Sequence, residues 1–243
     1  MTHAAHTLTT RDGVRIAFAQ HYQDSRSTAV IVCPGFFQSS QTPTFQRLSR
    51  ALAEQHNVIA MDFRGHGRSG GRYTFSAKEG ADLEAVLEWA RARYTRLGVI
   101  GFSMGGAIAI NTLSRSAERV RSLIAISAPS TFEQIEFRFW MPEAIRTGLQ
   151  GMERGAGCRP GNLLLPKERP IEVVSRLAPL PVLFIHGTRD VIVGVDHSRR
   201  LHAAAAEPKR LAIIEGGSHA QAMFRDDPRP FTNLLLDWLA QNL

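Results

Sequence analysis

The sequence predicts an α/β fold in which a mostly parallel β-sheet carries helices on both faces. Short, continuous apolar runs rich in β-branched residues alternate with longer stretches whose apolar residues recur at helical spacing. Continuous apolar runs are typical of strands buried on both faces, and their alternation with helices is typical of βαβ units. The length of 243 residues suits one domain with a modest insertion.

The apolar runs predict six strands, which follow an N-terminal hairpin. The hairpin is indicated by residues 6–10 and 14–20, which flank the turn signal formed by Asp12 and Gly13. The six runs lie at residues 28–33, 58–61, 97–102, 123–127, 182–185 and 211–214. Because a hairpin pairs antiparallel strands, we expect it at one edge of the sheet.

Helix start signals precede several of the amphipathic stretches. Thr42 followed by Pro43 is typical of an N-cap with proline at the first helical position. Ser76 and Glu79 have the spacing of a capping box, and residues 104–113 predict a further, tightly packed helix. The residues on the expected buried faces of the other helices are Phe45, Leu48, Leu52, Leu83, Val86, Leu87, Ala90, Phe231, Leu234, Leu235 and Trp238.

One stretch, residues 131–178, interrupts the alternation. It contains helical fragments with Gly and Pro between them but no clear strand, and it is too long for an ordinary connection. We therefore predict a core of residues 1–130 and 179–243, and we interpret residues 131–178 as a small lid inserted over the functional edge of the sheet. The first part of this lid is rich in Phe, Trp and Ile.

The composition is that of a soluble globular protein. Hydrophobic residues make up 44% and charged residues 21%; no apolar run is long enough to cross a bilayer, and the start lacks the pattern of a secretory signal. The two cysteines, Cys33 and Cys158, are too few for a disulfide framework, so we expect a cytoplasmic protein. The formal net charge of +7 comes from dispersed basic residues, and we expect no nucleic-acid partner.

The strongest chemical signal is the pattern G-x-S-x-G around Ser103. An apolar run precedes this serine and a helical stretch follows it. A serine at such a strand-to-helix turn is held in a strained conformation, and the flanking Gly101 and Gly105 remove side chains that would clash there. Its hydroxyl would lie at the carboxyl edge of the sheet, where α/β folds place their sites. Ser103 is therefore the candidate nucleophile.

Two residues downstream are candidates to activate this serine. A serine hydroxyl needs a base to take its proton and an acid to orient that base. Asp190 follows the run at 182–185, and His219 follows the run at 211–214 in the loop EGGSHA. Both should therefore reach the sheet edge that carries Ser103. The rivals that we consider weaker are Asp196 for the acid and His186, His197 and His202 for the base.

The loop that contains residues 62–69, DFRGHGRS, follows another apolar run. We interpret Asp62 and Arg64 as residues that tie this loop to its neighbours, and His66 as structural rather than catalytic. No two histidines or acids near the candidate site have the spacing of metal ligands, so we expect no metal.

Acyl transfer also needs two backbone N–H groups to stabilise the oxyanion of the transition state. One should come from Met104, directly after the candidate nucleophile. The other should come from residues 33–40, the loop after the run at 28–33, where Phe36 is the best candidate and Phe37 the second choice.

Four motifs together resemble the α/β-hydrolase family: GFSMGG, MDFRGHGRSGG, HGTRD and GGSHA. With the loop that begins at Pro34 they extend to His219, in the order that the family shows. The resemblance implies an eight-stranded sheet, a triad of Ser103, Asp190 and His219, and no cofactor. Within the family the chain looks similar to small-capped esterases of the monoacylglycerol-lipase and cinnamoyl-esterase kinds. It departs from many relatives in having Pro-Gly where they have His-Gly before the oxyanion residue.

These observations predict a serine hydrolase that cleaves a small-molecule carboxylic ester through an acyl-serine intermediate. Thioesters, amides or lactones as substrates, and acyl transfer in place of hydrolysis, stay open on the same triad. So does a non-catalytic ligand-binding protein that keeps the fold. The aromatic residues of the predicted lid favour a partly apolar acyl or aryl group. The natural substrate and the oligomeric state stay open.

Overall fold

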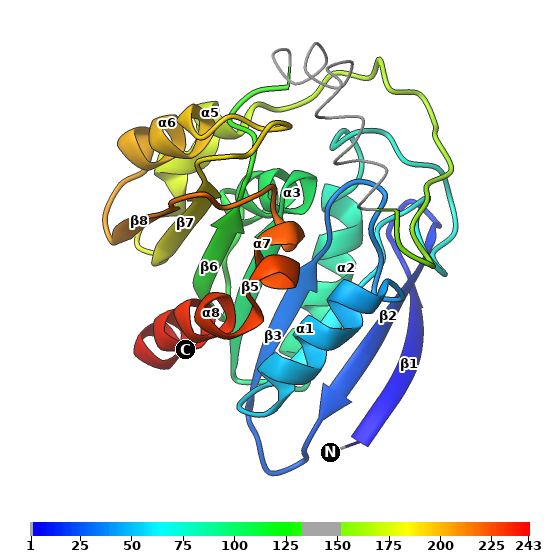
Figure 1. Ribbon diagram of the computed structural model, residues 1–243. Coiled ribbons are helices and arrows are strands. Elements are labelled where there is room, and N and C mark those ends of the chain that lie inside the picture. The colour runs from blue at the N-terminus through cyan, green and yellow to red at the C-terminus, as the bar shows by residue number, and fades with distance from the viewer. Residues whose placement is uncertain (1, 133–151) are drawn as a thin grey trace.

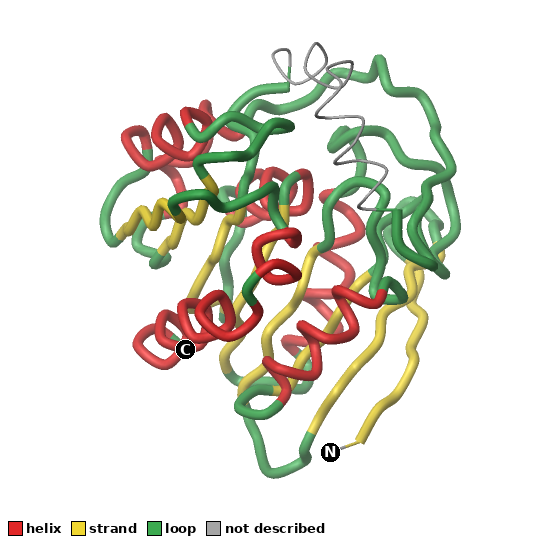
Figure 2. Tube along the Cα trace, in the orientation of Figure 1, coloured by secondary structure: helices red, strands yellow, loops and turns green. Residues whose placement is uncertain are grey.

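The computed structural model describes residues 2–132 and 152–243 and shows three layers, a twisted β-sheet between two layers of helices (Figure 1, Figure 2). Strands and helices alternate along most of the chain, as the sequence pattern indicates. The predicted α/β fold, with a mostly parallel eight-stranded sheet and helices on both faces, is confirmed.

The sheet is mixed only at its N-terminal edge. Its strands are β1 (Thr2–Thr9), β2 (Arg15–Tyr22), β3 (Thr28–Cys33), β4 (Asn57–Met61), β5 (Arg96–Phe102), β6 (Val120–Ile126), β7 (Val182–Gly187) and β8 (Lys209–Ile214). They lie in the order β1-β2-β4-β3-β5-β6-β7-β8. β2 is antiparallel to both of its neighbours, and all other adjacent pairs are parallel. Each predicted strand is present; β3 has the predicted bounds, and the ends of the other strands are shifted by a few residues.

Parallel pairing gathers the carboxyl ends of several strands at one edge of the sheet. Cys33 at the end of β3 pairs with Gly101 of β5, so the chain leaves these two strands side by side. Ile126 at the end of β6 pairs with Phe102 on one side and with Ile185 of β7 on the other. Loops that are far apart in the sequence therefore meet above this edge.

Two layers of helices cover the sheet. Helices α1 (Pro43–Ala53), α7 (Gln221–Asp226) and α8 (Pro228–Asn242) pack on one face (Figure 1). The other face carries α2 (Gly80–Arg91), α3 (Met104–Leu113), α5 (Pro170–Val173), the 3-10 helix η2 (Val174–Leu177) and α6 (Asp196–Ala204). The residues predicted for the buried helix faces are buried, apart from Leu234, which is partly buried. None of the helices in residues 2–132 and 152–243 is long and apolar enough to cross a membrane.

The two helix start signals have different outcomes. Thr42 is the N-cap residue of α1 and is followed by proline, as predicted. The predicted capping box is wrong, because α2 begins at Gly80 and Glu79 itself is the N-cap residue. The buried Glu79 carboxylate instead accepts the N–H and the hydroxyl of Thr74, at 2.6 and 3.0 Å. Ser76 has a φ of 80° and makes no capping bond. A buried carboxylate takes the donors nearest to it, and here these belong to the preceding loop.

The predicted lid lies partly outside the described residues, which end at 132 and resume at 152. Residues 152–169 contain no helix and no named strand. Two isolated bridges pair this segment with the loop after β4: His66 with Cys158, and Tyr73 with Pro160. The role of residues 131–178 as a lid stays a prediction.

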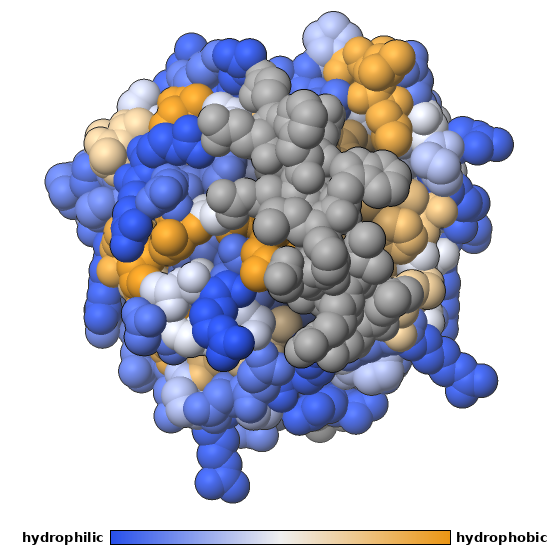
Figure 3. Space-filling model, turned by 45° about the horizontal axis from the view of Figure 1, so that its top comes forward, coloured by the Kyte–Doolittle hydropathy of each residue, from blue (hydrophilic) through white to orange (hydrophobic). Residues whose placement is uncertain are grey.

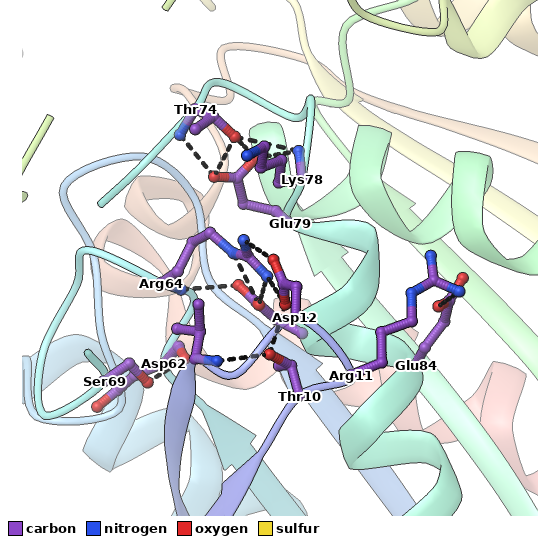
Figure 4. Close-up of polar contacts among 12 residues, drawn as sticks. Thr10, Arg11, Asp12, Asp62, Arg64, Ser69, Thr74, Lys78, Glu79 and Glu84 are labelled. Atoms are coloured by element: carbon purple, nitrogen blue, oxygen red, sulfur yellow. Dashed lines mark hydrogen bonds and ion pairs between the residues drawn. The ribbon is translucent and has the colours of Figure 1, made fainter. Parts of the chain in front are cut away.

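A buried charge network anchors the loop after β4 (Figure 4). The Arg64 guanidinium donates to the Asp82 carboxylate of α2 at 2.7 and 2.9 Å, and to the Asp12 carboxylate of the β1–β2 turn at 2.7 and 3.0 Å. The side chains of Arg64 and Asp82 are 3% and 0% exposed. Hydrogen bonds from Arg64 hold the pKa of Asp12 well below its usual range. The prediction that Arg64 ties this loop to its neighbours is confirmed.

Removal of one partner of this buried pair should destabilise the fold. We expect Asp82→Ala to lower the free energy of unfolding by roughly 3–5 kcal/mol, because it leaves the Arg64 charge buried with only the half-exposed Asp12 to compensate it. The matched control is Glu84→Ala, which breaks an exposed pair with Arg11 (N–O distance 3.3 Å, side chains 75% and 34% exposed) and should cost less than about 1 kcal/mol. Urea denaturation measures both; equal losses would contradict the prediction.

Candidate active site

Ser103 lies at a sharp turn between β5 and α3. Its φ of 50° and ψ of −117° lie outside the regions that L-residues prefer, which marks a strained position. The turn is closely packed on both sides. A Cβ on Gly105 would overlap the carbonyl oxygen of Cys33, and one on Gly101 would lie 2.6 Å from the carbonyl oxygen of Gly105. Only glycine fits at both positions, so the sequence around Ser103 is the one that this turn requires.

His219 lies in the loop between β8 and α7, with its ring against the serine. Its Nε2 is 3.0 Å from Ser103 Oγ. The next residue, Ala220, has a φ of 47°, and its N–H donates to the buried hydroxyl of Ser127 at 3.1 Å. The chain directly after β6 thus holds the loop that carries His219. Sequence reasoning did not single out Ser127, although its place at the end of an apolar run indicates the same sheet edge.

Asp190 follows β7 and contacts the other side of the His219 ring. Its Oδ2 is 2.7 Å from His219 Nδ1, while its Oδ1 accepts the N–H groups of Ile192 and Val193 at 3.0 and 2.9 Å. Burial alone would raise the pKa of Asp190, but the contacts with His219 and His186 outweigh it and hold this pKa well below its usual range. The carboxylate is therefore ionised. Its orientation is set by its contacts with His219, His186, Ile192 and Val193.

The rival residues have other partners. Asp196 is exposed and pairs with Arg199 at 2.9 Å. His186 is fully buried, with Nε2 2.7 Å from the Val193 carbonyl oxygen and 3.2 Å from Asp190 Oδ2, so it supports the acid rather than the serine. The contact between His186 and Asp190 was not predicted. His186 is near the end of β7 and Asp190 follows four residues later, just beyond the strand, and this closeness in the sequence was a signal for the contact. Within the described ranges, no three His, Cys, Asp or Glu side chains lie close enough to hold a metal ion.

Two backbone N–H groups near Ser103, those of Phe36 and Met104, have no hydrogen-bond partner in the part of the chain that the structure describes. Met104 is the first residue of α3, so its N–H has no acceptor within the helix. Phe36 lies in residues 33–40, here called the oxyanion loop, and a Cβ on the glycine before it would be 3.2 Å from the Cβ of Ser103. Neither N–H donates a hydrogen bond to any described residue. Phe37, the second choice, instead donates its N–H to Nε2 of His66 at 3.2 Å.

Aromatic rings surround the oxyanion loop. Phe36 stacks on Tyr73 with ring centroids 5.1 Å apart and lies 6.1 Å from Phe75, which in turn lies 5.9 Å from the buried Phe132. On the face above the carboxyl ends of the parallel strands, hydrophobic residues form separate patches among hydrophilic ones (Figure 3). The rings provide an apolar wall beside the candidate oxyanion donors.

The arrangement has a definite chemical capacity. The imidazole can take the serine proton as the oxygen attacks a carbonyl carbon, and the carboxylate keeps the accepting nitrogen aimed at the serine. The N–H groups of Phe36 and Met104 are the candidates to stabilise the negative charge that would develop on the carbonyl oxygen, and the N-terminal end of α3 would assist them. The structure thus brings together Ser103, Asp190, His219, Phe36 and Met104, the site residues that the sequence predicts.

Comparison with known sequences gives one family and several relatives. A family model described as alpha/beta hydrolase fold matches residues 28–151. The uncharacterized protein YfhR of Escherichia coli strain K12 is 29% identical over 171 residues, which cover 68% of this chain and 54% of YfhR. The alpha/beta hydrolase domain-containing protein WAV2 of Arabidopsis thaliana is 27% identical over 214 residues, or 82% of this chain and 65% of WAV2. The chain therefore spans about half the length of YfhR.

Solved structures share the fold over nearly the whole chain. The Pyrococcus furiosus esterase Pf2001 has a TM-score of 0.77 at 23% identity, with 99% of this chain and 93% of that chain covered. The esterase RhEst1 from Rhodococcus sp. ECU1013 has a TM-score of 0.80 at 20% identity, with 98% and 99% covered. At these identities the likeness is one of fold.

Proposed function

Because the chain belongs to the α/β-hydrolase family, we propose that it is a serine hydrolase that cleaves carboxylic esters through an acyl-serine intermediate. Ser103 is the nucleophile, His219 the general base, and Asp190 the acid that orients the base. The observation that carries this proposal is the unbroken series of contacts from Ser103 Oγ to His219 Nε2 at 3.0 Å and from His219 Nδ1 to Asp190 Oδ2 at 2.7 Å.

In the acylation step, Ser103 Oγ attacks the ester carbonyl carbon while its proton passes to His219 Nε2. The carbonyl oxygen becomes an oxyanion, which accepts hydrogen bonds from the N–H groups of Phe36 and Met104. Asp190 balances the positive charge that His219 gains. The tetrahedral adduct then collapses: the bond to the alcohol oxygen breaks, His219 gives its proton to that oxygen, and the acyl group stays on the serine.

The deacylation step repeats this chemistry with water. His219 Nε2 takes a proton from a water molecule, whose oxygen attacks the acyl carbon. The same two N–H groups stabilise the second oxyanion. When it collapses, the bond to Ser103 Oγ breaks and the serine recovers its proton from His219, so that a carboxylic acid leaves and the enzyme returns to its first state.

The substrate class follows from the surroundings of the oxyanion loop. An acyl group on Ser103 would lie beside Phe36, whose neighbours Phe75 and Phe132 extend the apolar wall. Aromatic walls favour apolar or aryl groups. Pf2001 and RhEst1 are both named esterases, which supports an ester as the bond that is cleaved.

A panel of p-nitrophenyl esters with rising acyl length, combined with a fluorophosphonate probe, tests this proposal. We expect hydrolysis to rise from acetate to a medium-length acyl group, since each additional buried CH₂ contributes about 0.8 kcal/mol to binding. We also expect the probe to label Ser103, which peptide mass spectrometry identifies.

Each other outcome favours a different alternative. Labelling of Ser103 with turnover of acyl thioesters but not of oxygen esters would favour a thioesterase on the same triad. Ester consumption that yields new esters with added alcohols, rather than free acid, would favour an acyltransferase. Folded protein that neither reacts with the probe nor turns over any ester or thioester would favour a non-catalytic binding protein and overturn the proposal.

A further inference from the structure

The oxyanion loop contains a residue in an unusual backbone conformation. Gln38 N–H donates to the Gly35 carbonyl at 3.1 Å, which closes a four-residue turn, and Phe37 at the third position has a φ of 64°. A type II turn demands a positive φ at that position, which glycine or asparagine usually supplies. A phenylalanine adopts this conformation only where its surroundings hold it there.

His66 holds Phe37 in place through the backbone N–H of Phe37. Its Nε2 accepts the Phe37 N–H at 3.2 Å, and its Nδ1 lies 3.1 Å from the carbonyl oxygen of Arg64. Because a carbonyl oxygen can only accept, the ring proton belongs on Nδ1, which leaves Nε2 as the acceptor. His66 is 2% exposed, and its ring packs edge-on against Tyr73 with centroids 4.7 Å apart, so the ring has little room to turn.

A second contact holds the carbonyl side of Phe37. Gly157 N–H donates to the Phe37 carbonyl oxygen at 2.9 Å, and the next residue, Cys158, forms the bridge with His66. Phe37 is therefore held through both of its backbone groups; the residue is 45% exposed, and its ring packs edge-on against Phe36 with centroids 4.3 Å apart. The oxyanion loop takes its shape from two segments that are remote from it in the sequence.

We propose that His66 is a positioning residue for the oxyanion hole. By accepting the Phe37 N–H, it turns that donor away from the nucleophile and leaves the Phe36 N–H free to act together with Met104. The inference rests on the proposed function, since an oxyanion hole has its role in acyl transfer.

Loss of this acceptor would act through the turn. A non-glycine residue at positive φ stores roughly 1–3 kcal/mol, which the hydrogen bond to His66 offsets. Without it the turn would relax, and the Phe36 N–H would move with it. An oxyanion donor is effective only within about 2.7–3.1 Å of the developing charge, so a small movement of Phe36 weakens the hole.

His66 keeps its acceptor nitrogen because it stays neutral. Burial lowers the pKa of His66 to about 4, and the charge of Arg159 acts in the same direction. Among the described residues, Tyr73 and Cys158 also lie against the ring; burial raises the pKa of both side chains, so neither adds charge near neutral pH. A protonated imidazole would carry N–H groups on both nitrogens and could no longer accept from Phe37.

Three variants test the proposal in the full-length protein. His66→Leu removes the acceptor, whereas His66→Gln places an amide oxygen near the position of Nε2. Ser69→Ala is the matched control. This buried hydroxyl lies in the same loop, accepts from Ala17 N–H at 2.8 Å and donates to the Asp62 carbonyl oxygen at 2.6 Å, so neither of these hydrogen bonds involves Phe37. For each variant, kcat and KM are measured with the best ester of the panel, and stability is measured by urea denaturation.

A transition-state analogue separates positioning from mere support of the fold. Ser103 Oγ adds to the carbonyl carbon of an alkyl trifluoromethyl ketone, its proton passes to His219, and the adduct places an oxyanion in the hole. We expect His66→Leu to lower kcat about 10- to 100-fold, with KM changed less than about threefold. The affinity for the ketone should fall by the same factor as kcat/KM. His66→Gln should recover most of both losses.

The results that would overturn the proposal are distinct from those that would overturn the proposed function. If His66→Leu loses stability as Ser69→Ala does but keeps kcat and ketone affinity, His66 is only structural. If His66→Gln is as impaired as His66→Leu while both stay folded, the acceptor at residue 66 is not the cause. If the wild-type protein itself neither hydrolyses esters nor reacts with the fluorophosphonate, the proposed function fails, and the inference that rests on it fails with it.

Discussion

Replacement of Ser103 by alanine is expected to lower kcat by roughly 10⁵- to 10⁶-fold and to leave the protein folded. The variant removes the atom that would form the covalent bond to the acyl group, and neither His219 nor the oxyanion donors can supply another. Initial rates with the best ester of the panel and loss of fluorophosphonate labelling measure the effect.

The stability of this variant can be anticipated from the backbone. Alanine keeps the Cβ, so the strain at a φ of 50° persists, and the change in the free energy of unfolding should be small. Ser103→Gly removes the Cβ and should be equally inactive but more stable, by about 1 kcal/mol. If Ser103→Gly is inactive and more stable than the wild-type protein, the strained turn serves catalysis rather than the fold.

The control for Ser103 lies at the other end of the same helix. Ser114 is the C-cap residue of α3, and its hydroxyl donates to the Asn111 carbonyl oxygen at 2.8 Å. Ser114→Ala should keep full activity. If Ser103→Ala retained more than about one hundredth of wild-type kcat in freshly purified protein, another residue would have to be the nucleophile.

The turn at Ser103 could be predicted from sequence because its requirements are local. A strand, two glycines, a serine and a helix follow one another without interruption, and the packing of Gly101 and Gly105 against backbone atoms explains the pattern. The positions of Asp190 and His219 could be predicted for a related reason. Each follows an apolar run, and parallel strands end at one edge, so these loops meet without any further information.

Other features could not be predicted because they depend on partners remote in the sequence. Ser127 anchors the His219 loop through Ala220, and this contact depends on how β6 lies beside β7 and β5. The spacing of Ser76 and Glu79 indicated a capping box, but burial gave Glu79 other donors. His66 looked structural in the sequence, and only its distance to Phe37 relates it to the oxyanion loop.

Replacement of Asp190 by asparagine is expected to lower kcat by about 10³- to 10⁴-fold, although the two side chains have nearly the same shape. Asn has one acceptor and one donor end where Asp has two acceptors. Oδ1 accepts two backbone N–H groups, from Ile192 and Val193, so the amide oxygen must take that place. The amide NH₂ is then left facing His219 Nδ1.

This orientation reverses the tautomer of His219. The NH₂ group donates to Nδ1, so the ring proton moves to Nε2, the nitrogen that lies 3.0 Å from Ser103 Oγ. A protonated Nε2 cannot take the serine proton, and the nucleophile loses its base while every distance stays nearly unchanged. Nitrogen-15 NMR of the His219 ring reports the tautomer directly and independently of turnover.

The same NH₂ group would also face His186, whose Nε2 lies 3.2 Å from Asp190 Oδ2 and donates to the Val193 carbonyl. The amide NH₂ and the N–H of His186 Nε2 are both donors and cannot hydrogen-bond to each other. The variant should therefore lose about 1–3 kcal/mol of stability, which urea denaturation measures. Asp196→Asn, at an exposed residue that pairs with Arg199, should leave both activity and stability unchanged. An Asp190→Asn variant that keeps the proton on Nδ1, or an Asp196→Asn variant that loses activity, would assign the orienting acid elsewhere.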